Sequence, residues 1–151
     1  MRVIKQEASM KMAVYHGIRD LRVEEVKEPK PGPKEVKIKV KYCGICGSDL
    51  HEYLHGLFPQ SPFGHEACGE IVAVGPEVAG FQPGDRVMGI VGGGGHAERL
   101  SLHERLCLRV PPGMSFEVAA AVPEAFLTAF DALFLRGGLR PGEAVLLHAA
   151  G

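Results

Sequence analysis

Four side chains in the sequence are of types that bind metal ions. They are the thiol of Cys46, the imidazole of His65 and the carboxylates of Glu66 and Glu124. Zinc at a catalytic site takes about three nitrogen, sulfur or carboxylate ligands and keeps one position open for water or substrate. These four residues are therefore the candidate ligands of a catalytic zinc ion.

The first candidate ligand lies in a glycine-rich turn. Cys46 is flanked by Gly44 and Gly47, where an expected strand turns into a short helix. We expect Ser48 to be the N-cap of that helix and Gly56 to end it. Because a helix N-terminus favours the thiolate form of a nearby cysteine, this position suits a metal ligand.

The other candidate ligands lie near expected starts of secondary structure. His65 follows Gly64 at the expected start of a strand, and Glu66 is the next residue. Neighbouring side chains in regular extended backbone point to opposite faces. His65 and Glu66 can therefore share one ion only if the backbone is irregular there, or if Glu66 approaches from behind. Glu124 follows Pro123 at the expected start of a helix, an exposed place for a carboxylate.

Composition and charge narrow the class of protein. The chain has 151 residues, of which 46% are hydrophobic and 23% charged, as in an ordinary globular domain. The net charge of −1 gives no reason to expect nucleic acid or an anionic membrane as a partner. No apolar run approaches the roughly 20 residues of a membrane span, and the N-terminus lacks the apolar stretch of a signal peptide. We expect a cytoplasmic protein whose four cysteines are thiols or metal ligands.

The hydrophobic pattern predicts a mainly β fold. Apolar residues alternate with lysines from Val36 to Tyr42, which indicates a strand with one buried face. Shorter strands with turns between them predict a small barrel. These further strands are expected at 12–15, 21–26, 64–75, 86–90, 96–102 and 106–110, with a loop of four glycines at 92–95.

The last part of the chain has a different pattern. An apolar helical face ends at Gly137 and Gly138, and a fully apolar strand is expected from Ala144 to His148. A helix followed by a buried strand is how an α/β domain begins. Such a strand would expose apolar surface without its sheet, so self-association is expected.

Two motifs together carry a family resemblance. Residues 44–51, with the sequence Gly-Ile-Cys-Gly-Ser-Asp-Leu-His, and residues 64–66, Gly-His-Glu, resemble the signature of zinc-type medium-chain alcohol dehydrogenases. Residues 11–28 resemble the polyol and butanediol members. The resemblance implies a partly open β-barrel of the GroES-like type with peripheral helices, and then the first strand of a missing Rossmann domain. The implied organisation is a leader at 1–9, a catalytic domain at 10–140 and the start of a nucleotide-binding domain at 141–151.

The resemblance also implies the residues of the zinc site. Cys46 and His65 would be zinc ligands, and Glu66 would bind the ion directly or exchange with water. Asp49 would orient His65 without binding the ion itself, as is common for the partners of metal-bound histidines. Glu124 falls where polyol-type members place a further glutamate of the zinc site.

The implied activity is oxidation of an alcohol or polyol, or the reverse reduction of a carbonyl, with NAD or NADP. Ser48 would hydrogen-bond the substrate hydroxyl, and His51 would pass its proton towards solvent. Gly151 stands where the glycine-rich loop that binds the dinucleotide begins. Since the rest of that loop is not in the sequence, we expect no turnover from this chain alone.

Two segments depart from the zinc-type pattern. The region after residues 86–89 passes directly into 92–98 without the four-cysteine lobe of many zinc-type members, so no structural zinc is expected. Residues 69–151 resemble zinc-free quinone oxidoreductases more closely. The glutamate that corresponds to Glu124 also occurs in those metal-free members.

Other interpretations of the same residues stay open. His65 could be a structural histidine, Glu124 a solvated or capping carboxylate, and Cys43 a buried small hydrophobic residue rather than half of a redox pair with Cys46. At the level of the whole domain, the alternatives are a zinc-free NADPH quinone or enone reductase and a non-enzymatic β-barrel module.

Overall fold

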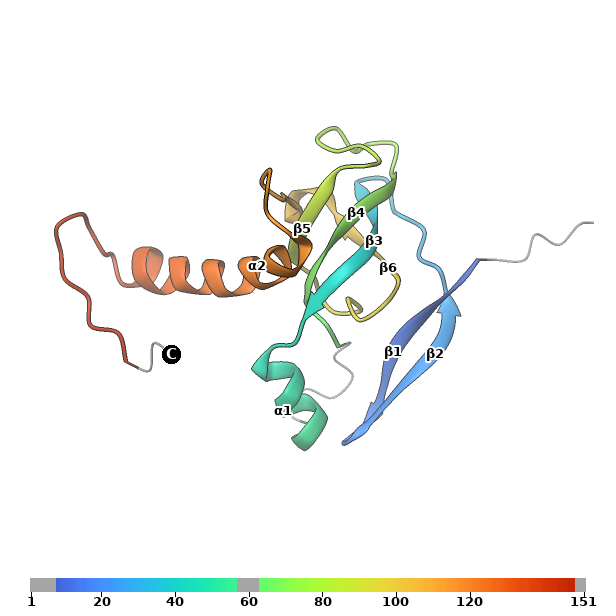
Figure 1. Ribbon diagram of the computed structural model, residues 1–151, viewed down its shortest axis with the longest axis horizontal. Coiled ribbons are helices and arrows are strands. Elements are labelled where there is room, and N and C mark those ends of the chain that lie inside the picture. The colour runs from blue at the N-terminus through green and yellow to red at the C-terminus, as the bar shows by residue number, and fades with distance from the viewer. Residues whose placement is uncertain (1–7, 57–62, 149–151) are drawn as a thin grey trace, which may run out of the picture.

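The computed structural model describes residues 8–56 and 63–148. Strands dominate the first two thirds of the chain, and a long helix follows them (Figure 1). The strands are β1 (Ser9–Gly17), β2 (Asp20–Lys27), β3 (Glu35–Gly44), β4 (Glu66–Val74), β5 (Arg86–Ile90), β6 (Arg99–His103) and β7 (Leu108–Arg109). The helices are α1 (Gly47–His55), α2 (Phe116–Phe130), the short 3-10 helix η1 (Glu104–Leu106) and the π-helical turn η2 (Asp131–Arg136).

The strands form a sheet and a hairpin that are joined along one edge. The sheet is antiparallel with the order β6-β3-β4-β5-β7, and β1 pairs with β2. Met12 of β1 forms a bridge with Ala97, and the next residue, Glu98, accepts a 3.0 Å hydrogen bond from the amide of Val40. The segment before β6 therefore connects the hairpin to β3. Among the strands that the structure describes, hydrogen bonds do not close a ring, so the expected mainly β, partly open barrel is confirmed.

The alternation predicted along β3 is confirmed in its first half. Val36 and Ile38 are 0% and 2% exposed, and they pack with Ile71 of β4 in the main hydrophobic core. The pattern ends at Tyr42, which is 45% exposed. The pairing of β3 with β4 shifts register between Val40 and Tyr42, and such a bulge re-aims the side chains beyond it.

Helix α2 begins earlier than the sequence indicated. Its N-cap is Ser115, whose hydroxyl accepts a hydrogen bond from the amide of Val118. Pro123 lies inside the helix with its side chain fully buried, so the expectation that Glu124 stands at a helix start is wrong. The helix continues through η2 and ends at Gly137, as predicted.

Only the first turns of α2 pack against the sheet. Ala119 and Ala120 are 0% and 5% exposed, and they contact Cys68 and Met88 in a second core cluster. The rest of the helix projects away from the strands (Figure 1). The continuous helical segment Phe116–Arg136 has 21 residues and contains an 18-residue stretch with a mean hydropathy of 1.6, which by length and composition alone would allow it to cross a membrane. The sequence alone predicts no apolar run of this length, because Pro123 interrupts it.

The expected strand from Ala144 to His148 is wrong. These residues lie in an extended tail with no strand pairing. Val145, Leu146 and Leu147 are 51%, 79% and 60% exposed. A strand needs the amides and carbonyls of a neighbour to complete its hydrogen bonds, and the described residues offer none beside the tail.

Candidate metal centre

The turn between β3 and α1 places the first candidate ligand. Cys46, not the expected Ser48, is the N-cap of α1, and Gly56 ends the helix in the left-handed conformation, as predicted. Asp49 causes this shift, because its Oδ2 accepts a 2.9 Å hydrogen bond from the amide of Cys46 and so fixes the residue at which the helix begins. The cysteine is thereby held at the N-terminus of α1.

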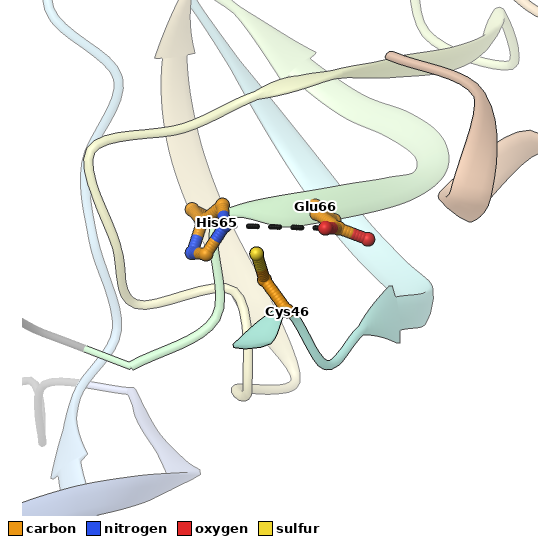
Figure 2. Close-up of side chains that lie close together, drawn as sticks. All are labelled: Cys46, His65 and Glu66. Carbon is orange, nitrogen blue, oxygen red and sulfur yellow. Dashed lines mark ion pairs between the residues drawn. The ribbon is translucent and has the colours of Figure 1, made fainter. Parts of the chain in front are cut away.

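Cys46, His65 and Glu66 converge on one point (Figure 2). Each offers one ligand atom, and these atoms all lie within 4.8 Å of one another. His65 Nε2 lies 3.9 Å from Glu66 Oε1. The side chains of the two residues are 21% and 12% exposed, so the cluster is largely shielded from solvent.

An irregular backbone allows adjacent residues to face the same point. Gly64 has a φ of 80°, and β4 begins only at Glu66, so His65 lies before the regular strand. A Cβ on Gly64 would lie 2.6 Å from the amide nitrogen of His96 and 3.0 Å from Cys43 Sγ. The glycine is required both by its conformation and by its packing.

A second glycine makes room for the carboxylate. A Cβ built on Gly44 would lie only 2.1 Å from Glu66 Oε2. Because Gly44 pairs with Glu66 across β3 and β4, any side chain at this position would force the carboxylate to move. Sequence reasoning treated Gly44 only as a turn residue, and the cross-strand pairing that reveals its role is not visible in the sequence.

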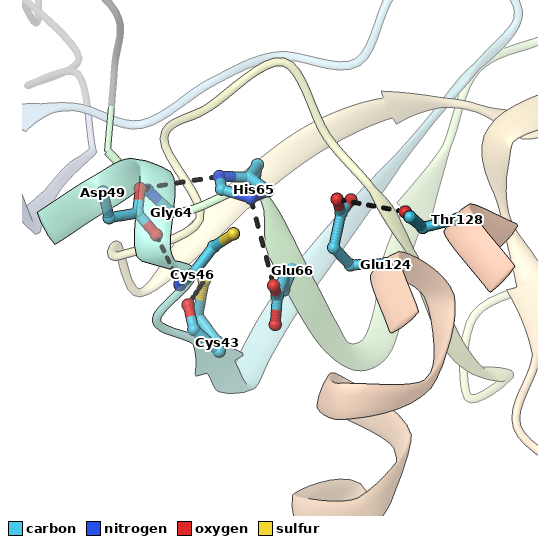
Figure 3. Close-up of polar contacts among 9 residues, drawn as sticks. Cys43, Cys46, Asp49, Gly64, His65, Glu66, Glu124 and Thr128 are labelled. Atoms are coloured by element: carbon cyan, nitrogen blue, oxygen red, sulfur yellow. Dashed lines mark hydrogen bonds and ion pairs between the residues drawn. The ribbon is translucent and has the colours of Figure 1, made fainter. Parts of the chain in front are cut away.

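Asp49 connects the turn that carries Cys46 to the turn that carries His65 (Figure 3). Its Oδ2 accepts from the Cys46 amide at 2.9 Å, and its Oδ1 accepts from the Gly64 amide at 3.2 Å and lies 3.5 Å from His65 Nδ1. The side chain is 7% exposed. The predicted contact with His65 is present. The additional hydrogen bonds from the backbone fix the positions of the two ligand-bearing turns relative to each other.

The other predicted site residues lie outside this group. Ser48 and His51 are exposed on α1. The carboxylate of Glu124 does not join the cluster, and its Oε1 accepts a 3.5 Å hydrogen bond from Thr128 one turn further along α2 (Figure 3). The structure therefore does not bring Glu124 to the metal ligands. Gly151, the predicted start of the dinucleotide-binding loop, lies outside the described residues.

The remaining cysteines behave as small hydrophobic residues. Burial raises the pKa of the Cys43, Cys68 and Cys107 thiols to about 11 in each case. All the cysteines are free thiols, and Cys43 packs against the main core. The expectation that Cys43 is a core residue agrees with this packing.

The cluster fits a zinc ion by the chemistry of its donors. One thiol, one imidazole and one carboxylate are the ligand types that zinc prefers, and three protein ligands leave a fourth position for substrate. Asp49 beside His65 Nδ1 directs Nε2 of the ring towards the cluster, as in carboxylate–histidine pairs at zinc sites. Among the described residues, no other group of three such side chains is close enough to hold an ion.

Comparisons with known proteins agree with this architecture. The family model for the alcohol dehydrogenase GroES-like domain matches residues 32–112. (R,R)-butanediol dehydrogenase of Bacillus subtilis is 39% identical over 151 aligned residues, which cover 75% of this chain and 44% of that protein. The chain therefore spans less than half the length of this relative.

Two solved structures represent the two resemblances. A quinone oxidoreductase of Pseudomonas syringae matches with a TM-score of 0.75 and 31% identity over 89% of this chain and 43% of its own. A Sinorhizobium meliloti 1021 protein, provisionally classed as a zinc-binding dehydrogenase and solved with NADP bound, matches with a TM-score of 0.68 and 28% identity over 76% and 42%. The chain belongs to the GroES-like domain family of the medium-chain dehydrogenases and reductases.

Proposed function

We propose that this chain is the catalytic domain of a zinc-assisted alcohol or polyol dehydrogenase. The observation that carries the proposal is the convergence of Cys46, His65 and Glu66 within 4.8 Å of one another. The similarity to butanediol dehydrogenase supports a small alcohol or its carbonyl product as the substrate. The four free thiols suit a reducing compartment such as the cytoplasm.

In this proposal Cys46 and His65 hold the ion, and Glu66 completes the site or gives way to substrate. A zinc ion in this site would act as a Lewis acid that favours the alkoxide form of the substrate. Asp49, whose Oδ1 lies 3.5 Å from His65 Nδ1, keeps the imidazole oriented, and its hydrogen bonds from the Cys46 and Gly64 amides fix the two turns.

Two residues on α1 would move the substrate proton. Ser48 follows the ligand cysteine by two positions and is exposed, so its hydroxyl is free to hydrogen-bond a substrate hydroxyl beside the cluster. His51 lies one helical turn further on, and its exposed imidazole can pass the proton to solvent. Hydride transfer requires a nicotinamide cofactor, NAD or NADP, and we propose that it is bound by a nucleotide-binding domain outside this sequence.

Elemental analysis of the purified chain tests the proposal directly. We expect about one zinc per chain, and we expect both Cys46→Ser and His65→Ala to lose it. Cys107→Ser and His16→Ala are the matched controls, because neither residue belongs to the cluster. A chain without bound zinc, or zinc that survives both ligand substitutions, would overturn the proposal.

The similarity to quinone oxidoreductase supports a second candidate. In this alternative the whole protein is a zinc-free NADPH-dependent quinone or enone reductase, and the cysteine and histidine have no metal. The same analysis separates the two functions, since the reductase predicts no zinc and equal stability of the wild type and His65→Ala in chelator. A non-enzymatic barrel likewise predicts that both ligand substitutions are tolerated.

A further inference from the structure

Helix α1 carries a pair of histidines that the candidate metal centre does not use as ligands. His51 and His55 are four positions apart, so they lie on one face of the helix, and both are exposed. Their ring centroids are 6.0 Å apart. The segment from 51 to 55 has the pattern His-Glu-x-x-His, in which two imidazoles one turn apart on a helix bind zinc in other proteins.

We propose that His51 and His55 form a second site for a divalent transition-metal ion, with water in the remaining positions. With zinc–nitrogen bonds of about 2.0–2.1 Å, two imidazoles on one tetrahedral ion have ring centroids about 5 Å apart. The observed 6.0 Å is close to this value, and exposed side chains can adjust their rotamers by that amount. Imidazole nitrogens suit zinc, nickel and copper ions.

The helix that presents the pair is held in place at its C-terminal end. The Glu52 carbonyl accepts hydrogen bonds from the Gly56 amide at 2.8 Å and from the Tyr15 hydroxyl at 3.1 Å. The Tyr53 carbonyl accepts from the Arg19 amide at 2.8 Å. The β1–β2 hairpin therefore fixes the last turn, so less side-chain and backbone freedom is lost when an ion binds. The C-terminal end of a helix also favours a nearby positive charge.

The site is one for binding rather than hydrolysis. In peptidases with this pattern the glutamate acts as the general base beside the ion. Here Glu52 is 3% exposed, and its carboxyl oxygen Oε1 is buried. The buried glutamate cannot reach a water molecule on an ion that the two exposed rings hold.

The site would also affect turnover, a consequence that rests on the proposed function. An ion on His51 occupies the imidazole that passes the substrate proton to solvent. Excess metal is therefore expected to inhibit the whole enzyme without displacing the zinc at Cys46.

Calorimetric titration with Ni²⁺ of the chain loaded with a single equivalent of zinc tests the second site. We expect one Ni²⁺ per chain, and we expect His55→Gln to weaken this binding by at least about tenfold, the smallest loss typical of even an outer ligand partner. His16→Gln is the matched control, because His16 is an exposed histidine outside α1 that pairs with Glu24 in the hairpin. Equal Ni²⁺ binding by the wild type and His55→Gln would overturn the proposal, as would no binding by either.

A second titration separates this inference from the proposed function. In a Cys46→Ser background the catalytic site is disabled, and the His51–His55 site predicts that Ni²⁺ binding persists and still depends on His55. Loss of Ni²⁺ binding in that background would assign the ion to the Cys46 cluster and contradict the second site. Zinc absent from the wild type would contradict only the catalytic proposal.

Discussion

The end of the sheet beside α1 and the C-terminal part of the chain differ in whether their side chains find partners among the described residues. At the metal centre, Asp49 joins two turns through its hydrogen bonds, and glycines at 44 and 64 allow the close approach of neighbouring groups. In the C-terminal part, apolar side chains are exposed at Phe126, Leu127, Phe130, Phe134, Leu135 and Leu146. The barrel thus completes its candidate metal site with its own residues, whereas the helix and tail require a surface that the described residues do not provide.

The largest expected contrast between the two regions is in packing. Ile71→Ala should lower the free energy of unfolding by about 2–5 kcal/mol, because the side chain is 1% exposed in the main core. Leu146→Ala removes similar atoms from a side chain that is 79% exposed, and its effect should stay within about 0.5 kcal/mol. Urea denaturation measures both, and equal losses would show that the tail is packed after all.

Two glycines allow a matched comparison of packing in the two regions, because both have a positive φ and differ in the atoms around them. Gly138→Ala (φ 65°) meets no atom within 4 Å and should cost at most about 1–2 kcal/mol. Gly64→Ala (φ 80°) adds a clash with His96 and Cys43 and should cost about 1–3 kcal/mol more. Thermal unfolding compares the pair, and a smaller shift for Gly64→Ala would contradict the tight packing beside the metal centre.

The role of Asp49 can be isolated by a conservative change. Asp49→Asn keeps the shape of the side chain but leaves one oxygen to serve the Cys46 amide, the Gly64 amide and the His65 ring. We expect zinc affinity to fall by about 10–100-fold, as measured by competition with a coloured chelator. Asp131→Asn, which disturbs only an ion pair with Arg136 in the C-terminal part, is the control and should leave affinity unchanged.

Alkaline pH should weaken the barrel through its buried thiols. Burial raises the pKa of Cys68 and Cys107 from 9.0 to about 11 in the folded state. In the unfolded chain the thiols lose protons above about pH 9, so stability is intact below that pH and falls towards pH 11, by up to about 1.4 kcal/mol per pH unit for each thiol. Cys107→Ala should make the decline shallower, and an unchanged slope would show that this thiol is not shielded.

The smallest effect concerns association in solution. The apolar face of the second half of α2 should make the chain self-associate, and Phe126→Glu should reduce the associated fraction in sedimentation velocity. Leu106→Glu changes an equally apolar side chain, 56% exposed, on the barrel side. If that control reduced association as much as Phe126→Glu, the C-terminal face would not be the contact.

The sequence predicted those features that depend on local pattern. The lysine-alternating strand at β3 and the strand Arg86–Ile90 were both found, because one has a clear period of two and the other lies between turn signals. The proximity of Cys46, His65 and Glu66 came from the family resemblance, and the geometry confirms it.

The features that were missed depend on contacts between distant residues. Gly44 is required by Glu66 across two paired strands, and Asp49 bonds the Gly64 amide from another turn. Pro123 looked like a boundary but is accommodated inside α2 by burial against the sheet. The apolar run at the C-terminal end had the composition of a strand but no neighbour to pair with, so composition alone was misleading there.

X-ray absorption at the zinc edge of the zinc-loaded chain tests the central claim most directly, since it reports the atoms bound to the ion. Binding by Cys46, His65 and Glu66 predicts one sulfur at about 2.3 Å, with nitrogen and oxygen atoms at about 2.0–2.2 Å. A first shell without sulfur, or a chain that retains no zinc, would contradict the assignment of this cluster as the metal centre.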